Sequence, residues 1–229
     1  PSISKSRLYL YLFFFITLTS IFNFQLLEVY QNKFILKQIN ISGLSNNEKK
    51  IVENEFKNLK NISIFKLDKD KIFNILNKFK FLEEIHVNKV IPSTININLS
   101  KTSILGKTLI NDENFYIGRN GKLIESNQLF EKIDTSTIYG DFKVQEFLNL
   151  IDILDNNQLD RNKIKEFYYY KNKRWDLLFT NGVTLMLPSK NFNESIKIYK
   201  NLLKNSNLIN IKIIDLRVSN QIILTNYNE

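Results

Sequence analysis

Hydrophobic and polar residues follow two different periods in the first half of this chain. Apolar side chains recur every three or four positions over residues 46–59 and 69–79, which predicts two amphipathic helices. They alternate with polar ones over residues 35–41, 85–89 and 95–99, which predicts three strands. The order strand, helix, helix, strand, strand is typical of one small α/β domain.

The second half is dominated by the period of strands. Asn181-Gly182 separates two apolar runs, and this dipeptide is the strongest short signal for a β-hairpin turn. A similar hairpin is predicted around Gly118–Gly121, and the last two strands are predicted on either side of a turn at Ser219-Asn220. Two helices interrupt the strands. Their inward-facing residues are expected to be Phe142, Phe147, Leu150, Ile151 and Leu154 in one helix, and Ile196, Tyr199, Leu202 and Leu203 in the other.

The N-terminal segment differs from the rest. Leu8 to Leu27 contains no charged residue, and at ~1.5 Å per residue such a helix is about as long as a bilayer core is thick. The run is longer than the apolar region of a cleaved signal peptide and lacks a small-residue cleavage site, which favours an uncleaved anchor. Lys5 and Arg7 precede it and Glu28 follows, so we expect the N-terminus in the cytoplasm and the bulk of the chain outside.

These elements predict an α+β protein with four parts. They are a cytoplasmic stub (residues 1–7), a transmembrane helix (8–28), a β-α-α-β-β domain (33–102) and a β domain with an antiparallel sheet and flanking helices (103–229).

Composition changes this picture little. The net charge of +9 suggests an anionic partner, but the chain has no alanine and is crowded with Lys, Asn, Ile and Phe throughout. We therefore interpret the lysines as solvated surface and expect no nucleic-acid partner. Cysteine is absent, which excludes disulfides, thiolate catalysis and Cys-based zinc sites.

A search for chemistry yields no catalytic set. His86 is the single histidine and lies in an alternating strand, where a surface position is expected rather than that of a general base. Asp68 and Asp70 lack the glycine and glutamate of a calcium loop and fit a helix start better. We predict that the chain is not an enzyme and takes no cofactor, metal or small-molecule substrate.

Several motifs together resemble the FtsQ/DivIB family of bacterial cell-division proteins. They are "ILKQINISGL", "SIFKLDKDKIFNIL", "FLEEIHVNKVIPSTININL", "YIGRNGKLIES", "RWDLLFTNGVTLMLP" and "IIDLRVSN". The order of parts also resembles that family, which has a cytoplasmic tail, one span, a POTRA domain and a β domain. The chain departs from the family pattern after the POTRA hairpin, where "LSKTSILGK" lacks the usual Glu and Pro.

The resemblance implies a scaffold in the inner membrane at the division septum. Its β domain would hold FtsB-like and FtsL-like single-pass coiled-coil proteins, and its span and POTRA domain would contact other division proteins. One alternative is a POTRA-type periplasmic chaperone or adaptor for envelope assembly, for which several POTRA repeats or a barrel would be expected. The other is an envelope enzyme, for which a carboxylate pair or a nucleophile–base set would be expected.

The last strand raises the question of what pairs with its outer edge. An exposed edge accepts a partner strand through main-chain hydrogen bonds, so we predict strand addition here. The predicted contact residues are Asp215, Arg217, Val218, Asn220, Ile222 and Leu224, with Lys171, Lys173 and Arg174 facing acidic residues of the partner. The competing interpretations are a structural ion pair between Asp215 and Arg217, a solvated turn for "KNKR", and a core position for Trp175.

Overall fold

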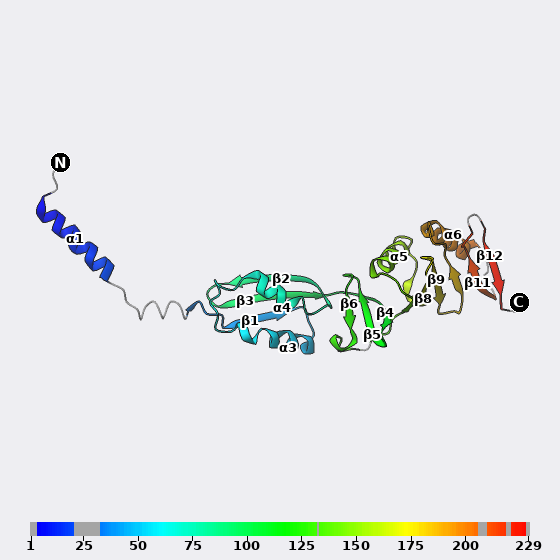
Figure 1. Cartoon of the computed structure of the whole chain (residues 1–229), viewed down its shortest axis with the longest axis horizontal. Coiled ribbons are helices and arrows are strands. Elements are labelled where there is room, and N and C mark those ends of the chain that lie inside the picture. Colours follow the sequence, from blue (N-terminus) through cyan, green and yellow to red (C-terminus); the bar gives the residue numbers. More distant parts are fainter. Residues whose placement is uncertain (1–3, 21–32, 132, 206–209, 219–220, 228–229) are drawn as a thin grey trace. The chain divides into compact units, whose positions relative to one another are not determined.

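The computed structural model describes residues 4–20, 33–131, 133–205, 210–218 and 221–227 (Figure 1). The chain divides into two compact units. One comprises Pro1–Ile75 and Ile85–Asn98, the other Leu76–Glu84 and Leu99–Glu229.

The N-terminal helix α1 spans Lys5–Ser20, and its apolar side chains are exposed. It is 16 residues long. No helix among the described residues is long and apolar enough to cross a bilayer. The rest of the predicted span, from residue 21, lies outside the described residues.

The first sheet is three-stranded, with the strand order β1-β3-β2. β1 and β3 are parallel, with Gln38 opposite Thr94 and Ser42 opposite Asn98. The elements follow the predicted strand, helix, helix, strand, strand order: β1 (Gln38–Ser42), α3 (Asn46–Glu55), the short 3-10 helix η1 (Lys57–Leu59), α4 (Lys69–Leu76), β2 (Leu82–Val90) and β3 (Thr94–Lys101). Val52 and Phe56 from the α3 region, Ile72 from α4 and Ile97 from β3 are buried, whereas Ile51 is exposed.

The second unit contains a nine-stranded sheet. Its strands are β4 (Ile104–Ile110), β5 (Glu113–Gly118), β6 (Leu123–Glu125), β7 (Thr137–Tyr139), β8 (Ile164–Tyr169), β9 (Trp175–Phe179), β10 (Thr184–Met186), β11 (Ile211–Asp215) and β12 (Ile223–Asn226). Its helices are η2 (Ser126–Gln128), α5 (Val144–Asn156), η3 (Arg161–Lys163) and α6 (Phe192–Asn205). The predicted hairpins at Gly118–Gly121 and at Asn181-Gly182 are confirmed, since β5 pairs with β6 and β9 with β10, both antiparallel.

This sheet is mixed, so the prediction of an antiparallel sheet is wrong in part. The strand order is β12-β11-β10-β9-β8-β7-β4-β5-β6, with parallel pairs β4/β7, β7/β8 and β10/β11. The reason is that α5 connects β7 to β8 and α6 connects β10 to β11. A helix that crosses over between neighbouring strands returns the chain in the same direction, which makes the two strands parallel.

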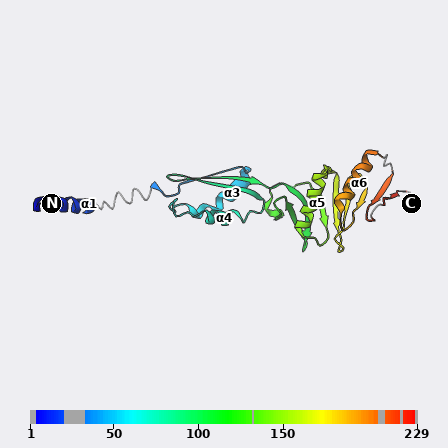
Figure 2. The same cartoon turned by 90° about the horizontal axis from the view of Figure 1, so that it is seen from above.

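α5 and α6 cover one face of this sheet. They lie on the same side of the strands in Figure 1 and in front of them in Figure 2. Phe147, Leu150, Ile151 and Leu154 of α5 and Ile196 and Tyr199 of α6 are buried in the core, as predicted. Phe142 packs against that core from ahead of the helix, and Leu203 is 48% exposed, so the inward position predicted for it is wrong. Trp175 is buried in the core, which confirms that interpretation over a contact role.

Candidate functional site

The last strand, β12, lies at one edge of the nine-stranded sheet (Figure 1). It pairs antiparallel with β11 on its inner side, with Asp215 opposite Ile223 and Ile214 opposite Leu224. No described strand pairs with its outer side. We call this outer side the β12 edge.

A row of buried core residues crosses the sheet and ends at this edge. Each member lies directly opposite the next on the neighbouring strand. The row runs Ile138, Phe167, Leu177, Leu185, Ile214 and Leu224. The first five members are at most 1% exposed, whereas Leu224 is 42% exposed. The apolar row therefore continues to a position where another strand would cover it.

The main-chain groups of β12 are oriented for such a strand. Tyr227 donates its backbone N–H to the carbonyl of Asn210 at 3.1 Å, toward β11. Since successive residues of a strand point their N–H and C=O groups to opposite sides, Ile223 and Thr225 also face β11. Leu224 and Asn226 then present theirs to the β12 edge.

A groove lies next to the start of β12, between the start of α6 and the connection from β11 to β12. Its volume is about 490 Å³. Leu216, Val218, Ile222 and Ile198 contribute apolar surface, and Lys190, Glu194 and Arg217 contribute charge. Val218 and Ile222 are 50% and 44% exposed, which is high for large apolar side chains.

Asp215 and Arg217 form the ion pair considered above as one interpretation. Arg217 Nε donates to both carboxylate oxygens of Asp215, at 2.8 and 2.9 Å, and its backbone N–H donates to Oδ1 at 2.9 Å. These hydrogen bonds hold the pKa of the Asp215 carboxyl below its usual value. The pair orders the chain where it leaves β11, while the Arg217 side chain remains 42% exposed.

Arg174 is held in a second ion pair. Its Nε lies 3.2 Å from Oδ1 of the buried Asp176, and its guanidinium lies 4.2 Å from the centre of the Tyr170 ring. Burial raises the pKa of the Asp176 carboxyl, and the charge of Arg174 opposes that rise. Arg174 therefore has a structural partner, whereas Lys171 and Lys173 extend into solvent from the turn before β9.

The structure does not bring the predicted contact residues together along one strand, since Lys171, Lys173 and Arg174 lie before β9, three strands from β12 in the sheet order. Leu224 lies in β12, whereas Val218 and Ile222 lie in the connection, because β11 already ends at Asp215. Asn220 lies outside the described residues.

Sequence reasoning did not predict the part of the groove that comes from the α6 region, or the acidic partner of Arg174. Ile198 and Lys190 come from the α6 region, and no local pattern links them to the last strand. Asp176 was identifiable as a lone acid within the apolar run "RWDLLF".

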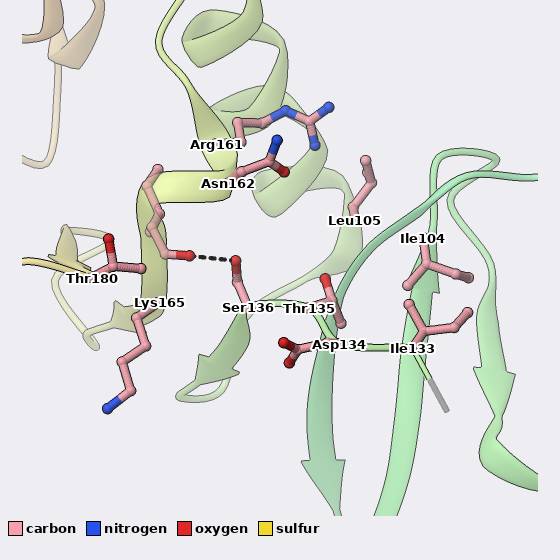
Figure 3. Close-up of a pocket in the computed structure, with 11 residues that line it drawn as sticks. Ile104, Leu105, Ile133, Asp134, Thr135, Ser136, Arg161, Asn162, Lys165 and Thr180 are labelled. Carbon is pink, nitrogen blue, oxygen red and sulfur yellow. Dashed lines mark hydrogen bonds between the residues drawn. The ribbon is translucent and has the colours of Figure 1, made fainter. Parts of the chain in front are cut away.

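A second cavity, of about 410 Å³, lies near the starts of β4, β7 and β8 (Figure 3). The Ser136 hydroxyl in its wall donates to the Ile164 carbonyl at 2.7 Å, so it is not an available nucleophile. Arg161 contacts Asp155 at 2.6 Å, and the Arg161 and Lys165 side chains point in opposite directions. The charged groups of this wall do not converge on one point.

Metal-binding chemistry is also not apparent. In the part of the chain that the structure describes, no three His, Cys, Asp or Glu side chains cluster as metal ligands would. His86 is exposed on β2, as expected.

The fold and the edge describe a class of protein: a POTRA unit followed by a β domain with an exposed last strand. Comparison with known families agrees. Residues 34–101 match the model of the FtsQ-type POTRA domain, and residues 109–217 match that of the C-terminal part of cell division protein FtsQ/DivIB. The chain belongs to the FtsQ/DivIB family of cell-division proteins. The second match ends at Arg217, so β12 lies beyond it.

Individual proteins give the same result. The chain is 29% identical over 202 residues to cell division protein FtsQ of Rickettsia bellii and 28% identical to that of Rickettsia typhi, in both cases covering 85% of this chain and 73% of the relative. Among solved structures, the major extracytoplasmic domain of DivIB from Geobacillus stearothermophilus is similar at 13% identity and a TM-score of 0.31, over 47% of this chain and 99% of that one. A likeness of that size adds no weight.

Proposed function

We propose that the chain is a non-catalytic scaffold of the division machinery, anchored in the inner membrane at the septum. Residues 8–28 form the span, with residues 1–7 in the cytoplasm and the two folded units in the periplasm. The uncharged run from Leu8 to Leu27 and the preceding Lys5 and Arg7 support this topology. The POTRA unit and the span contact other division proteins.

The β domain holds its partners by strand addition at the β12 edge. The observation that carries this proposal is the apolar row that ends at the half-exposed Leu224, beside outward-facing main-chain groups of Leu224 and Asn226. A partner strand would complete both the row and the ladder. The groove then receives a side chain of the partner and supplies specificity, while Lys190 and Arg217 in its lining favour an acidic one. Lys171 and Lys173, in the turn before β9, face further acidic residues of the partner.

The partners we propose are single-pass coiled-coil proteins of the FtsB and FtsL type. Site-specific photo-cross-linking in cells tests this, with the photoreactive residue at Val218 or Ile222 and adducts identified by mass spectrometry. We expect adducts to a small single-span coiled-coil protein. If neither position forms an adduct while a photoreactive residue at Asn40 on β1 does, recognition would lie on the POTRA unit and the proposal would be refuted.

A further inference from the structure

The POTRA sheet has an open edge of its own, along β1. β1 is the outermost strand in the order β1-β3-β2, and Figure 1 shows it at the margin of the sheet next to α3. Gln38 donates its N–H to the Ser93 carbonyl at 3.2 Å, so in this parallel ladder Gln38, Asn40 and Ser42 face β3. The main-chain N–H and C=O groups of Ile39 and Ile41 consequently point to the outer side.

A ladder of polar side chains ends at this edge. Asn40 Nδ2 donates to Asn96 Oδ1 across the two strands at 2.9 Å, and Gln38 Nε2 donates to Asn40 Oδ1 at 2.8 Å. Ser42 Oγ lies 3.3 Å from Asn98 Oδ1. All these side chains lie on the exposed face of the sheet, where a further strand with amide or hydroxyl side chains would extend the ladder.

A groove of about 300 Å³ runs between the start of β1 and the end of α3. Phe56 and Ile39 supply apolar lining, and Lys37, Lys57 and Lys60 supply positive charge. Glu53 is the single acid among the described residues that line it, and its carboxylate lies 3.8 Å from Lys49 Nζ. The groove next to the open edge is therefore basic.

We propose that the β1 edge is a second strand-addition site, which takes an extended acidic segment of another protein. The main chain of that segment bonds to Ile39 and Ile41, its amide or hydroxyl side chains continue the ladder from Asn40, and its carboxylates face Lys57 and Lys60. A second copy of this chain is the less suitable occupant, because it brings the same three lysines to a groove that is already basic.

Lysine at a sheet edge also has a purely protective use, since it prevents edges from pairing. The two roles predict opposite results for Lys37. If Lys37 only protects the edge, Lys37→Gln increases the binding of any extended peptide. If it belongs to the site, Lys37→Gln weakens the binding of acidic peptides.

The test uses the full chain in detergent micelles and a synthetic nine-residue peptide that alternates Val with Asp, Glu, Asn and Thr. Binding is measured by fluorescence anisotropy, and the amides of Ile39 and Ile41 are followed by hydrogen exchange. We expect saturable binding and slower exchange at both amides. Replacing Lys57 and Lys60 together by Glu should weaken binding about tenfold. Lys50→Glu, an exposed control on α3 outside the groove, should change it less than twofold.

Two peptide controls isolate the chemistry. A peptide with Lys in place of Asp and Glu should bind at least tenfold more weakly. One with Pro at the positions that face β1 should slow exchange much less, because Pro has no N–H to donate to the Ile39 and Ile41 carbonyls and the ladder loses half of its hydrogen bonds. Equal binding of the acidic and basic peptides, or tighter binding after Lys37→Gln, would overturn the proposal. The proposal would also be overturned if, without peptide, the protection of the Ile39 and Ile41 amides from exchange increased with protein concentration. Such an increase would indicate that two copies of the chain pair through this edge. Exchange at Ile39 and Ile41 reports only the β1 edge, and repeating the anisotropy titration with Leu224→Asp removes the contribution of the β12 edge.

Discussion

Leu224→Asp is the most direct test of strand addition at the β12 edge. The substitution leaves the main chain of β12 in place and changes only the last member of the apolar row. Leu224 is 42% exposed and lies in a four-residue edge strand, so the unfolding free energy should fall by less than about 1 kcal/mol. Partner binding should fall much more.

The size of that loss is estimated from burial. Covering a Leu side chain fully contributes about 1.5–3 kcal/mol, so covering the exposed fraction of Leu224 contributes about 1 kcal/mol. A carboxylate placed against an apolar residue of the partner costs about 1–3 kcal/mol more. The sum, about 2–4 kcal/mol, corresponds to roughly thirtyfold to thousandfold weaker binding.

The assay is titration calorimetry with the periplasmic part of the FtsB/FtsL-type partner identified by cross-linking. Leu109→Asp is the matched control, because Leu109 is an exposed Leu on β4 of the same sheet, far from β12 in the strand order. Circular dichroism melts check that both variants fold. Affinity of Leu224→Asp within threefold of the unsubstituted chain, or an equal loss in Leu109→Asp, would refute the reasoning.

Two further predictions concern stability. Because the pKa of Asp215 is lowered in the folded protein, its ion pair stabilises the fold at pH values above the unfolded pKa of about 4. This stabilisation is lost as the pH falls through the pKa that Asp215 has in the folded protein. Asp215→Asn should therefore cost about 1 kcal/mol at pH 7 and less at pH 3, measured by urea unfolding; an equal cost at both pH values would contradict the ion-pair account. The second prediction compares two glycines with positive φ. A Cβ on Gly140 would lie 2.2 Å from the backbone carbonyl oxygen of Tyr169, which cannot move easily. A Cβ on Gly182 would lie 2.5 Å from the hydroxyl oxygen of Tyr227, at the end of a flexible side chain. Gly140→Ala should cost about 2–4 kcal/mol and Gly182→Ala about 1 kcal/mol in thermal unfolding, and the reverse order would be inconsistent with this geometry.

Local patterns predicted most elements of this fold. The Asn181-Gly182 turn, the hairpin that leads into β3 and the helix around Phe147 all follow from signals within about fifteen residues. The strand order did not follow, because the parallel pairing of β10 with β11 depends on how α6 crosses the sheet. The same non-local packing explains Leu203, which continues the apolar period of α6 but lies beyond the surface that the sheet covers.

The candidate site was predicted in outline only. The last strand was predicted to lie at an edge of the sheet, and among the described strands β12 does. The groove was not predictable, because Ile198 and Lys190 precede β11 and reach the edge only through the path of α6. Alternation also misplaced Val218, since the ion pair of Asp215 with Arg217 turns the backbone out of the strand three residues earlier than the hydrophobic pattern indicates.

The orientation of the backbone in β12 has a consequence for how this surface tolerates mutation. Leu224 and Asn226 offer a partner N–H and C=O groups, which every residue except proline possesses. Much of the proposed pairing would thus be independent of which side chains stand at these positions. Two proteins that bind in this way could each accumulate substitutions over many generations and still bind, provided that neither acquires a proline or a buried charge in the paired strands.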